Sequence, residues 1–268
     1  MMKNLFKSFL ILLAVSAAVP CLAQTPNILT AKEKKQGWTL LFNGKDFNGW
    51  RQCNGTAMPA NWVIDDNAMK VFTAEGKKPG QGSNGDIVFE KRKFKNFELS
   101  VDWKAGNMGN SGIFYYVREV PGKPIYYAAP EVQVLDNVNA TDNKLANHLA
   151  GSLYDMLPAD PKTVNPAGEW NTIIIKVNNG KVTHIQNGKK VVEYTLWTKD
   201  WDNMVANSKF KDFPGFTEGI AHGIHRVRNN NKNCVWRMLQ NILSYTLYYT
   251  CINTDQLFTC HTRFARNA

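Results

Sequence analysis

The segment Phe97–Trp103 alternates apolar and polar side chains without a fault, and this pattern constrains the fold more than any other. In a β-strand successive side chains point to opposite faces, so this segment predicts a strand with one buried and one polar face. Strands buried on both sides in parallel α/β sheets instead read as continuous apolar runs. The apolar side chains are Phe97, Leu99, Val101 and Trp103, and the polar ones are Glu98, Ser100 and Asp102.

Further segments of strand length follow one another along the chain with turn-forming residues between them. Asp65-Asp66-Asn67, Asn178–Lys181 and Gln186–Lys189 carry the Asn, Asp and Gly residues typical of hairpin turns. Without helical periodicity, this organisation predicts an all-β protein, either a β-sandwich or a jelly roll. The expected additional strands span residues 38–42, 62–64, 68–72, 86–89, 111–117, 131–135, 170–177, 182–185 and 191–194.

The first residues have the layout of a secretory signal peptide. Two lysines precede an apolar run over residues 9–19, and small residues follow. We expect residues 1–24 to be removed by cleavage near Ala23 or Gln24, which predicts a secreted, periplasmic or extracellular protein. The alternative is a lipid anchor on Cys21, for which Pro20 is an unfavourable neighbour. The apolar run is too short to span a bilayer, and no later stretch is long enough, so no membrane span is expected.

A net charge of +10 is typical of nucleic-acid-binding proteins, but its distribution along the chain argues against such a role. Two positive charges lie in the expected signal peptide and a net +5 lies beyond residue 221, which leaves about +3 for residues 25–221. That body has no basic cluster interleaved with aromatic residues, so no nucleic-acid partner is expected. The cysteines show no CxxC spacing, which argues against a zinc site built from thiolates.

The most informative candidate site is the expected strand Pro130–Asn137. Alternation places Glu131 and Gln133 on one face and Val132 and Val134 on the other. A carboxylate and a carboxamide about 7 Å apart can hold a polyhydroxylated ligand or position a general acid or base. A solvated strand face is the alternative interpretation.

Other residues are weaker candidates. Asn110 and Ser111 offer hydrogen bonds where a strand begins, although a tight bend explains them equally well. Tyr116 and Arg118 share a face and could stack on a sugar ring and bind its oxygens, although aromatic residues in strands are mostly core. Paired carboxylates catalyse glycoside hydrolysis, and exposed acids on one strand are more often solvated. The remaining candidates are Tyr154, Trp170 and Asn171 at strand entries, and the outward carboxylates Glu98 and Asp102.

Several common chemistries lack their motifs. The sequence has no H-x-H, HExxH or DxDxDG element, so a metal would need ligands gathered from distant strands. It also has no G-x-S-x-G elbow and no P-loop. The usual nucleophile and nucleotide chemistries therefore have no support.

Taken in order, seven short motifs resemble the secreted 3-keto-disaccharide hydrolase family over roughly residues 37–221. Each motif alone is weak, and their order carries the resemblance. The motifs are Trp38–Asp46 with Gly49-Trp50, Phe97–Leu99, Asn110–Ile113, Glu131–Gln133 with Leu135-Asp136, Gly151–Tyr154, Glu169–Asn171 and Asn187-Gly188.

The resemblance implies a concanavalin A-like jelly-roll sandwich with a ligand site on its concave face. It also implies action on glycosides oxidised at C3, either as a hydrolase or as a 1,2-lyase and glucal hydratase. A C3 ketone acidifies the C2 proton, so a base can remove it while donors or a divalent metal stabilise the enolate. No cofactor is otherwise expected. A non-catalytic carbohydrate-binding module and an ordinary glycoside hydrolase are the alternatives on the same fold.

Motif by motif, the resemblance makes Glu131 the leading acid or base. Asp136 and Glu98 are secondary catalytic candidates. The expected substrate binders are Asn110, Ser111, Tyr116 and Gln133.

The predicted organisation is therefore a signal peptide (1–24), an N-terminal extension (25–36), the β-sandwich domain (37–221) and a divergent basic tail (222–268). The tail lacks the Gly-Leu-Gln-Asp-His-Gly-like and Trp-Phe-Arg-Asn-Ile strands with which the family usually ends. We expect it to be disordered or to result from a frameshift near residue 222, with a central strand lost. Resequencing the locus tests this hypothesis, which fails if the other frame cannot encode those strands.

Overall fold

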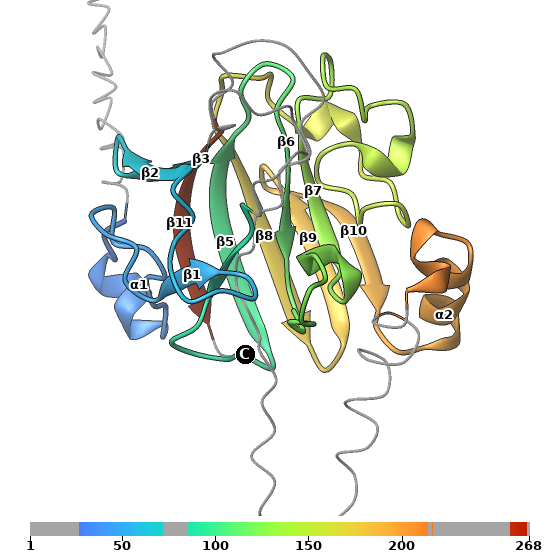
Figure 1. Cartoon of the computed structure of the whole chain (residues 1–268), viewed down its shortest axis with the longest axis horizontal. Coiled ribbons are helices and arrows are strands. Elements are labelled where there is room, and N and C mark those ends of the chain that lie inside the picture. Colours follow the sequence, from blue (N-terminus) through green and yellow to red (C-terminus); the bar gives the residue numbers. More distant parts are fainter. Residues whose placement is uncertain (1–26, 72–84, 214–215, 217–257, 267–268) are drawn as a thin grey trace, which may run out of the picture.

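The structure is a computed structural model that describes residues 27–71, 85–213, 216 and 258–266. Its larger layer is a seven-stranded antiparallel sheet with the strand order β10-β9-β8-β5-β11-β3-β2 (Figure 1). The strands are β2 (Trp62–Asp65), β3 (Ala68–Val71), β5 (Phe97–Lys104), β8 (Asn171–Asn178), β9 (Lys181–Gln186), β10 (Lys189–Thr195) and β11 (Phe258–Arg266).

A second layer lies against this sheet. It consists of two antiparallel pairs, β1 (Trp50–Gln52) with β4 (Ile87–Phe89) and β6 (Asn110–Phe114) with β7 (Glu131–Leu135). In Figure 1, β1, β6 and β7 lie in front of the seven-stranded sheet. The chain is therefore an all-β sandwich, which confirms the predicted fold class.

The core fills the space between the layers. The four apolar side chains of β5 are at most 1% exposed, and Ile173, Ile175 and Val177 of the neighbouring β8 are fully buried. Burying one such side chain contributes about 1.5–3 kcal/mol relative to leaving it exposed. The alternation of Phe97–Trp103 thus has the expected cause, because one face of β5 packs on the second layer.

Local turn chemistry fixes the register of the hairpins. The β2–β3, β8–β9 and β9–β10 turns are built on Asp66-Asn67, Asn179-Gly180 and Asn187-Gly188, and all six residues have positive φ. Consecutive positive φ angles are those of the hairpin turn that matches strand twist, which Asn and Gly adopt at low cost. The three predicted hairpins are confirmed.

Two expected strands differ from the structure. Residues 38–42 do not form a strand, and only Thr39 makes an isolated bridge. Leu41 and Phe42 are both buried, so these neighbours do not alternate between faces as a strand would require. The expected strand 111–117 ends at Phe114 because Tyr116 has a φ of 53°, which breaks the extended course.

The two α-helices lie at opposite edges of the sandwich (Figure 1). Thr30 and Glu33 form a reciprocal capping box at the start of the first helix, in the predicted N-terminal extension. The sequence pattern did not predict the helices, because all are short. They are α1 (Ala31–Lys35), α2 (Lys199–Ala206) and the 3₁₀ turns η1 (Ile125–Tyr127), η2 (Ala146–His148), η3 (Pro161–Thr163) and η4 (Lys209–Asp212).

The divergent tail contributes one strand to the sheet. β11 pairs antiparallel with β5 on one side and with β3 on the other. The sequence predicts the loss of a central strand, but β11 occupies a central position in the sheet. Residues 217–257 and 267–268, which include the rest of the tail, lie outside the described residues, as does the predicted signal peptide. Among the helices that are described, none is both long and apolar enough to cross a membrane.

Candidate functional site

The site is built on the face of β6 and β7 that points away from the core. Val132 and Val134 belong to the core, so Glu131 and Gln133 lie on the opposite face. Glu131 is only 3% exposed and Gln133 only 1%. The alternative of a solvated strand face is therefore wrong, because this polar face is covered.

Gly112 on β6 makes room for the Glu131 carboxylate. A Cβ atom at this glycine would lie 1.9 Å from Oε1 and 2.6 Å from Cδ of Glu131. Real Cβ atoms essentially never approach other heavy atoms this closely, so the carboxylate would have to move. Glycine is thus required where the carboxylate crosses the backbone of the neighbouring strand.

Charges around Glu131 oppose one another. Burial raises the pKa of the Glu131 carboxyl to about 8; the Lys209 ammonium lowers it, and the negative charges of Asp86 and Asp142 raise it further. Burial favours the neutral acid because a carboxylate loses its hydration in a covered site. The group therefore exchanges its proton near neutral pH, where a general acid or base is most useful.

Tyr154 is positioned by a chain segment that runs beside β7. Gly151 N–H donates to the Gln133 carbonyl at 2.8 Å, and Tyr154 N–H donates to the Glu131 carbonyl at 3.0 Å. An isolated antiparallel bridge joins Val132 to Leu153 in the same segment. This backbone pairing places the Tyr154 phenol next to the polar face of β7.

Asp142 collects the polar groups of this face. Its Oδ2 atom accepts a hydrogen bond from the Tyr154 hydroxyl at 2.8 Å. Longer contacts of 3.5 Å join the same oxygen to Gln133 Nε2 and Asn110 Nδ2. Its Oδ1 atom lies 2.8 Å from Nδ1 of His148. One carboxylate thus connects β6, β7 and two residues outside the strands.

His148 lies between two carboxylates. Its Nε2 atom is 2.8 Å from Oδ1 of Asp155, opposite the contact with Asp142. The imidazole ring also stacks on the Tyr154 ring, with centroids 4.4 Å apart. Its two nitrogens and one ring face are therefore all in contact with neighbouring side chains.

Lys209 completes the arrangement at the start of η4. Its backbone N–H donates to Asp155 Oδ2 at 2.6 Å, and its Nζ lies 3.9 Å from the centre of the Tyr154 ring. Burial lowers the pKa of the Lys209 ammonium, while Glu131, Asp155 and Asp142 raise it. We call these residues the Glu131 cluster: Asn110, Glu131, Gln133, Asp142, His148, Tyr154, Asp155 and Lys209.

Of the predicted binding residues, Asn110, Gln133 and Tyr154 meet Glu131 in this cluster, and others do not. Ser111 is fully buried on the core side of β6. Tyr116 packs in the core and donates its hydroxyl to the Lys95 carbonyl, whereas Arg118 is exposed. The two therefore share no binding face.

Trp170 and Asn171 also lie apart from the cluster. The Trp170 ring is half-buried beneath the ammonium of Lys104, 5.0 Å from its centre. The Asn171 side chain accepts from Asn165 N–H at 2.8 Å and from Asn187 Nδ2 at 2.7 Å. Asn171 thus holds the loop before β8 against the β9–β10 turn.

The two secondary carboxylates have local partners elsewhere. Asp136 accepts hydrogen bonds from the backbone N–H groups of Met108, Val138 and Asn139, and so fixes the turn after β7. Glu98 forms an ion pair with Lys176 at 3.3 Å on the outer face of the large sheet. Neither carboxylate reaches the Glu131 cluster.

The sequence did not single out Asp142, His148, Asp155 or Lys209. These residues lie in loops or in short 3₁₀ turns, where no periodicity indicates which side chains converge. The described residues hold no group of three or more His, Cys, Asp or Glu side chains arranged to bind a metal ion.

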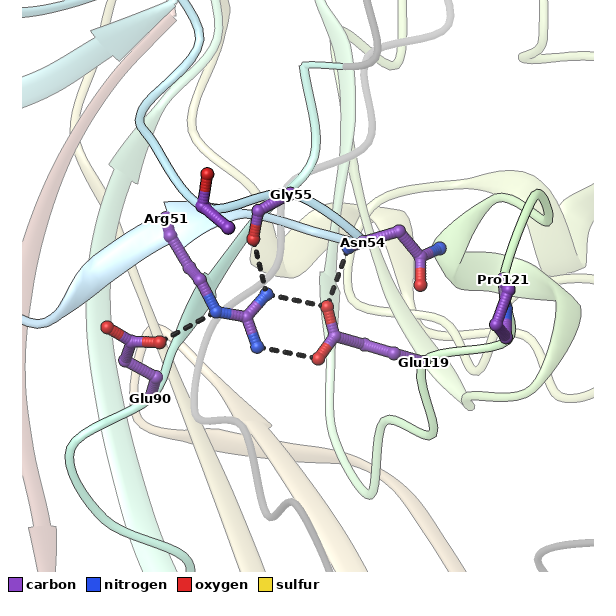
Figure 2. Close-up of a pocket in the computed structure, with 7 residues that line it drawn as sticks. Arg51, Asn54, Gly55, Glu90, Glu119 and Pro121 are labelled. Atoms are coloured by element: carbon purple, nitrogen blue, oxygen red, sulfur yellow. Dashed lines mark hydrogen bonds and ion pairs between the residues drawn. The ribbon is translucent and has the colours of Figure 1, made fainter.

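A hollow of about 480 Å³ lies elsewhere, around Arg51 and Glu119 (Figure 2). Arg51 donates to both oxygens of Glu119 at 2.7 Å, to Glu90 at 2.7 Å and to the carbonyl of Gly55 at 3.2 Å. Asn54 N–H donates to Glu119 as well, at 2.6 Å. Because the guanidinium is already occupied, we assign this network to tethering the β1 end to the loop after β6.

Comparisons with known proteins agree with this fold. The model of the 3-keto-alpha-glucoside-1,2-lyase-like domain matches residues 37–229. A 3-keto-disaccharide hydrolase from Bacteroides thetaiotaomicron is 46% identical over 186 residues, which are 65% of this chain and 64% of that protein. The chain thus spans less than two thirds of the length of this curated relative.

Two solved structures from Parabacteroides distasonis, both of candidate glycosyl hydrolases, have a similar fold. The first superposes with a TM-score of 0.72 at 27% identity and covers 91% of this chain and 100% of its own. The second has a TM-score of 0.59 at 22% identity, covers 86% of this chain and 99% of its own, and bears on the fold alone.

Proposed function

Because this chain belongs to the 3-keto-alpha-glucoside-1,2-lyase-like family, we propose that it is an enzyme that cleaves 3-keto-glycosides by removing the proton at C2. The observation that carries the proposal is the buried Glu131 carboxyl near the Lys209 ammonium. Burial raises the pKa of this carboxyl to about 8, although Lys209 lowers it. The activity named for the 46% identical relative supports the same substrate class.

In the proposed reaction the Glu131 carboxylate takes the C2 proton, which the adjacent C3 ketone has made acidic. The electron pair left at C2 is delocalised onto the ketone oxygen as an enolate, and the C1–O bond to the aglycone then breaks. The aglycone oxygen takes up a proton, and a 2-hydroxy-3-keto-glucal is formed. Addition of water across its C1–C2 double bond gives the net products of hydrolysis.

The other residues of the cluster match the remaining needs of this reaction. The Lys209 ammonium offers positive charge beside Glu131, where the enolate oxygen develops negative charge. The amides of Asn110 and Gln133 and the Tyr154 hydroxyl offer hydrogen bonds to sugar hydroxyls. In this proposal Glu131 is the base, Lys209 the electrostatic stabiliser, and the amides and the phenol bind the substrate.

Incubation with a 3-keto-disaccharide in deuterated water tests the function. Proton abstraction predicts release of the aglycone and a glucal intermediate 18 mass units below 3-keto-glucose, or 3-keto-glucose labelled at C2 after hydration. Cleavage without C2 labelling would indicate direct hydrolysis. Binding without turnover would indicate a carbohydrate-binding module, and turnover of the unoxidised disaccharide an ordinary glycosidase.

The pH dependence of kcat/KM should follow the Glu131 carboxyl. The protonated acid cannot accept the C2 proton, so the rate should rise about tenfold per pH unit below a pKa of about 8 and level off above it. Rates measured from pH 5 to 9.5 test this. A rate that falls across this range would mean that Glu131 works as an acid.

Replacing Lys209 with methionine should lower kcat/KM by about 10²-fold, because one preorganised positive charge beside the enolate is lost. The same substitution should shift the rising limb of the pH profile to higher pH, since Lys209 lowers the pKa of Glu131. Lys211→Met is the matched control, because Lys211 is exposed on the same 3₁₀ turn. Equal kinetics of the two variants would contradict the role of Lys209.

We also propose that the protein is exported, on the basis of the signal-peptide layout of residues 1–24. Mass spectrometry of the native protein should find its N-terminus near residue 24 or 25. Recovery of the intact N-terminal segment from the cytoplasm would overturn this.

A further inference from the structure

Both ring nitrogens of His148 contact carboxylates, an arrangement that packing alone does not require. Its side chain is 12% exposed, and each ring nitrogen lies 2.8 Å from a carboxylate oxygen, one of Asp142 and one of Asp155. An ionised carboxylate only accepts hydrogen bonds. Both contacts are N–H···O hydrogen bonds to ionised carboxylates when both ring nitrogens carry protons, as in an imidazolium.

The two carboxylates that hold His148 each lead to another part of the Glu131 cluster. Asp142 accepts the hydroxyl of Tyr154, and Asp155 accepts the backbone N–H of Lys209. Asp155 has a φ of 59°, and its own N–H donates to the carbonyl of Asn147 at 3.1 Å. The His148 ring therefore joins the carboxylate that contacts Tyr154 to the carboxylate that contacts the backbone of Lys209.

We propose that His148 is a positioning residue whose imidazolium balances Asp142 and Asp155, and thereby sets the charge of the site in which Glu131 exchanges its proton. The expected change in the kcat/KM profile rests on the function proposed above. The expected change in the titration of Glu131 does not depend on that function. It assigns to His148 no contact with the substrate.

The charged groups that face Glu131 determine the direction in which its pKa should change when His148 is replaced. They are Lys209, Asp86 and Asp142, with the Tyr154 phenol alongside. The trio Asp142, His148 and Asp155 carries one net negative charge while His148 is protonated. Removing the imidazolium leaves two uncompensated carboxylates, and added negative charge raises the pKa of a neighbouring acid.

Three variants separate this electrostatic role from a structural one. His148→Gln adds one net negative charge to the trio, Asp155→Asn removes one, and the double variant restores the charge of the native protein. We expect the rising limb of the kcat/KM profile to move to higher pH by about 0.5–1 unit in His148→Gln and to lower pH in Asp155→Asn. The double variant should return close to the native midpoint.

The same midpoints should be measured without substrate. In protein carrying ¹³C-labelled glutamate, the carboxyl resonance missing from Glu131→Gln reports the titration of Glu131. Midpoints that move up, down and back in the three variants support the inference. This holds even if no 3-keto-glycoside is turned over, a result that would overturn only the proposed function.

A structural role gives a different result. If all three variants lose activity or thermal stability while the Glu131 midpoint stays within 0.2 units, or if His148→Gln moves it to lower pH, the inference is wrong. Should His148→Gln not fold, Asp155→Asn alone decides, because only the electrostatic role predicts a downward shift.

Discussion

Replacing Glu131 with glutamine should reduce kcat/KM for a 3-keto-disaccharide by about 10³-fold, the largest effect of any substitution in the Glu131 cluster. Glutamine has the same shape, so it fits over Gly112, but its amide cannot take up the C2 proton. Substrate binding should therefore change little. Turnover assays combined with calorimetric binding of the 3-keto-disaccharide to the inactive variant measure both quantities.

Glu98→Gln is the matched control for this experiment. Glu98 is also a strand carboxylate, but it pairs with Lys176 on the outer face of the large sheet. Its replacement should leave kcat/KM within about twofold of the native value, because the cost of losing an exposed ion pair is small. If Glu98→Gln lost as much activity as Glu131→Gln, the site would have to be placed elsewhere.

The same Glu131→Gln substitution should stabilise the protein at alkaline pH. The folded-state pKa of Glu131 is raised from 4.5 to about 8, so the folded protein loses stability as pH rises from about 4.5 through 8. Glutamine carries no such penalty. We expect a gain in unfolding free energy on the order of a few kcal/mol at pH 9 and a negligible difference at pH 4. Urea unfolding at both values tests this, and a difference independent of pH would contradict it.

Replacing Gly112 with alanine is the second substitution with a large expected effect. The added methyl group would overlap the Glu131 carboxylate, with contacts of 1.9–2.8 Å to Oε1, Cδ and Cγ. The carboxylate must then move or the strands must separate. We expect a loss of about 1–3 kcal/mol of stability and of at least about 10²-fold in kcat/KM.

Gly55→Ala provides the comparison for Gly112→Ala. The three atoms nearest to a Cβ atom at Gly55 all belong to the Gln52 side chain, at 3.0–3.4 Å, so this site is less crowded. Its effects on stability and turnover should be much smaller. If Gly112→Ala retained native activity and melting temperature, Glu131 would not need its present position over β6.

The sequence predicted those parts of the molecule whose cause is local. The hairpin at Asn187-Gly188 follows from two residues that tolerate positive φ, and the face of β7 that carries Glu131 follows from the strand period. The assignment of Asp136 shows where this fails. The family resemblance made Asp136 a secondary catalytic candidate, but here its carboxylate accepts backbone N–H groups and so forms the turn.

The rest of the Glu131 cluster depends on tertiary contacts. Asp142, His148 and Asp155 come from loops and a 3₁₀ turn next to residues 151–154, whose backbone pairs with β7. Lys209 lies beyond α2 in the sequence. No pattern of apolar residues in the sequence predicts that these four residues lie near Glu131. Only a structure brings the four residues to Glu131.

The position of β11 has a consequence for how this protein matures. The strand lies between β5 and β3, yet it is made from residues 258–266, synthesised more than 150 residues after β5. Until it arrives, both neighbours present open edges that can pair with other chains. The large sheet therefore closes only after the ribosome has translated residue 266, and a nascent chain of this kind would remain a good substrate for holding chaperones until then.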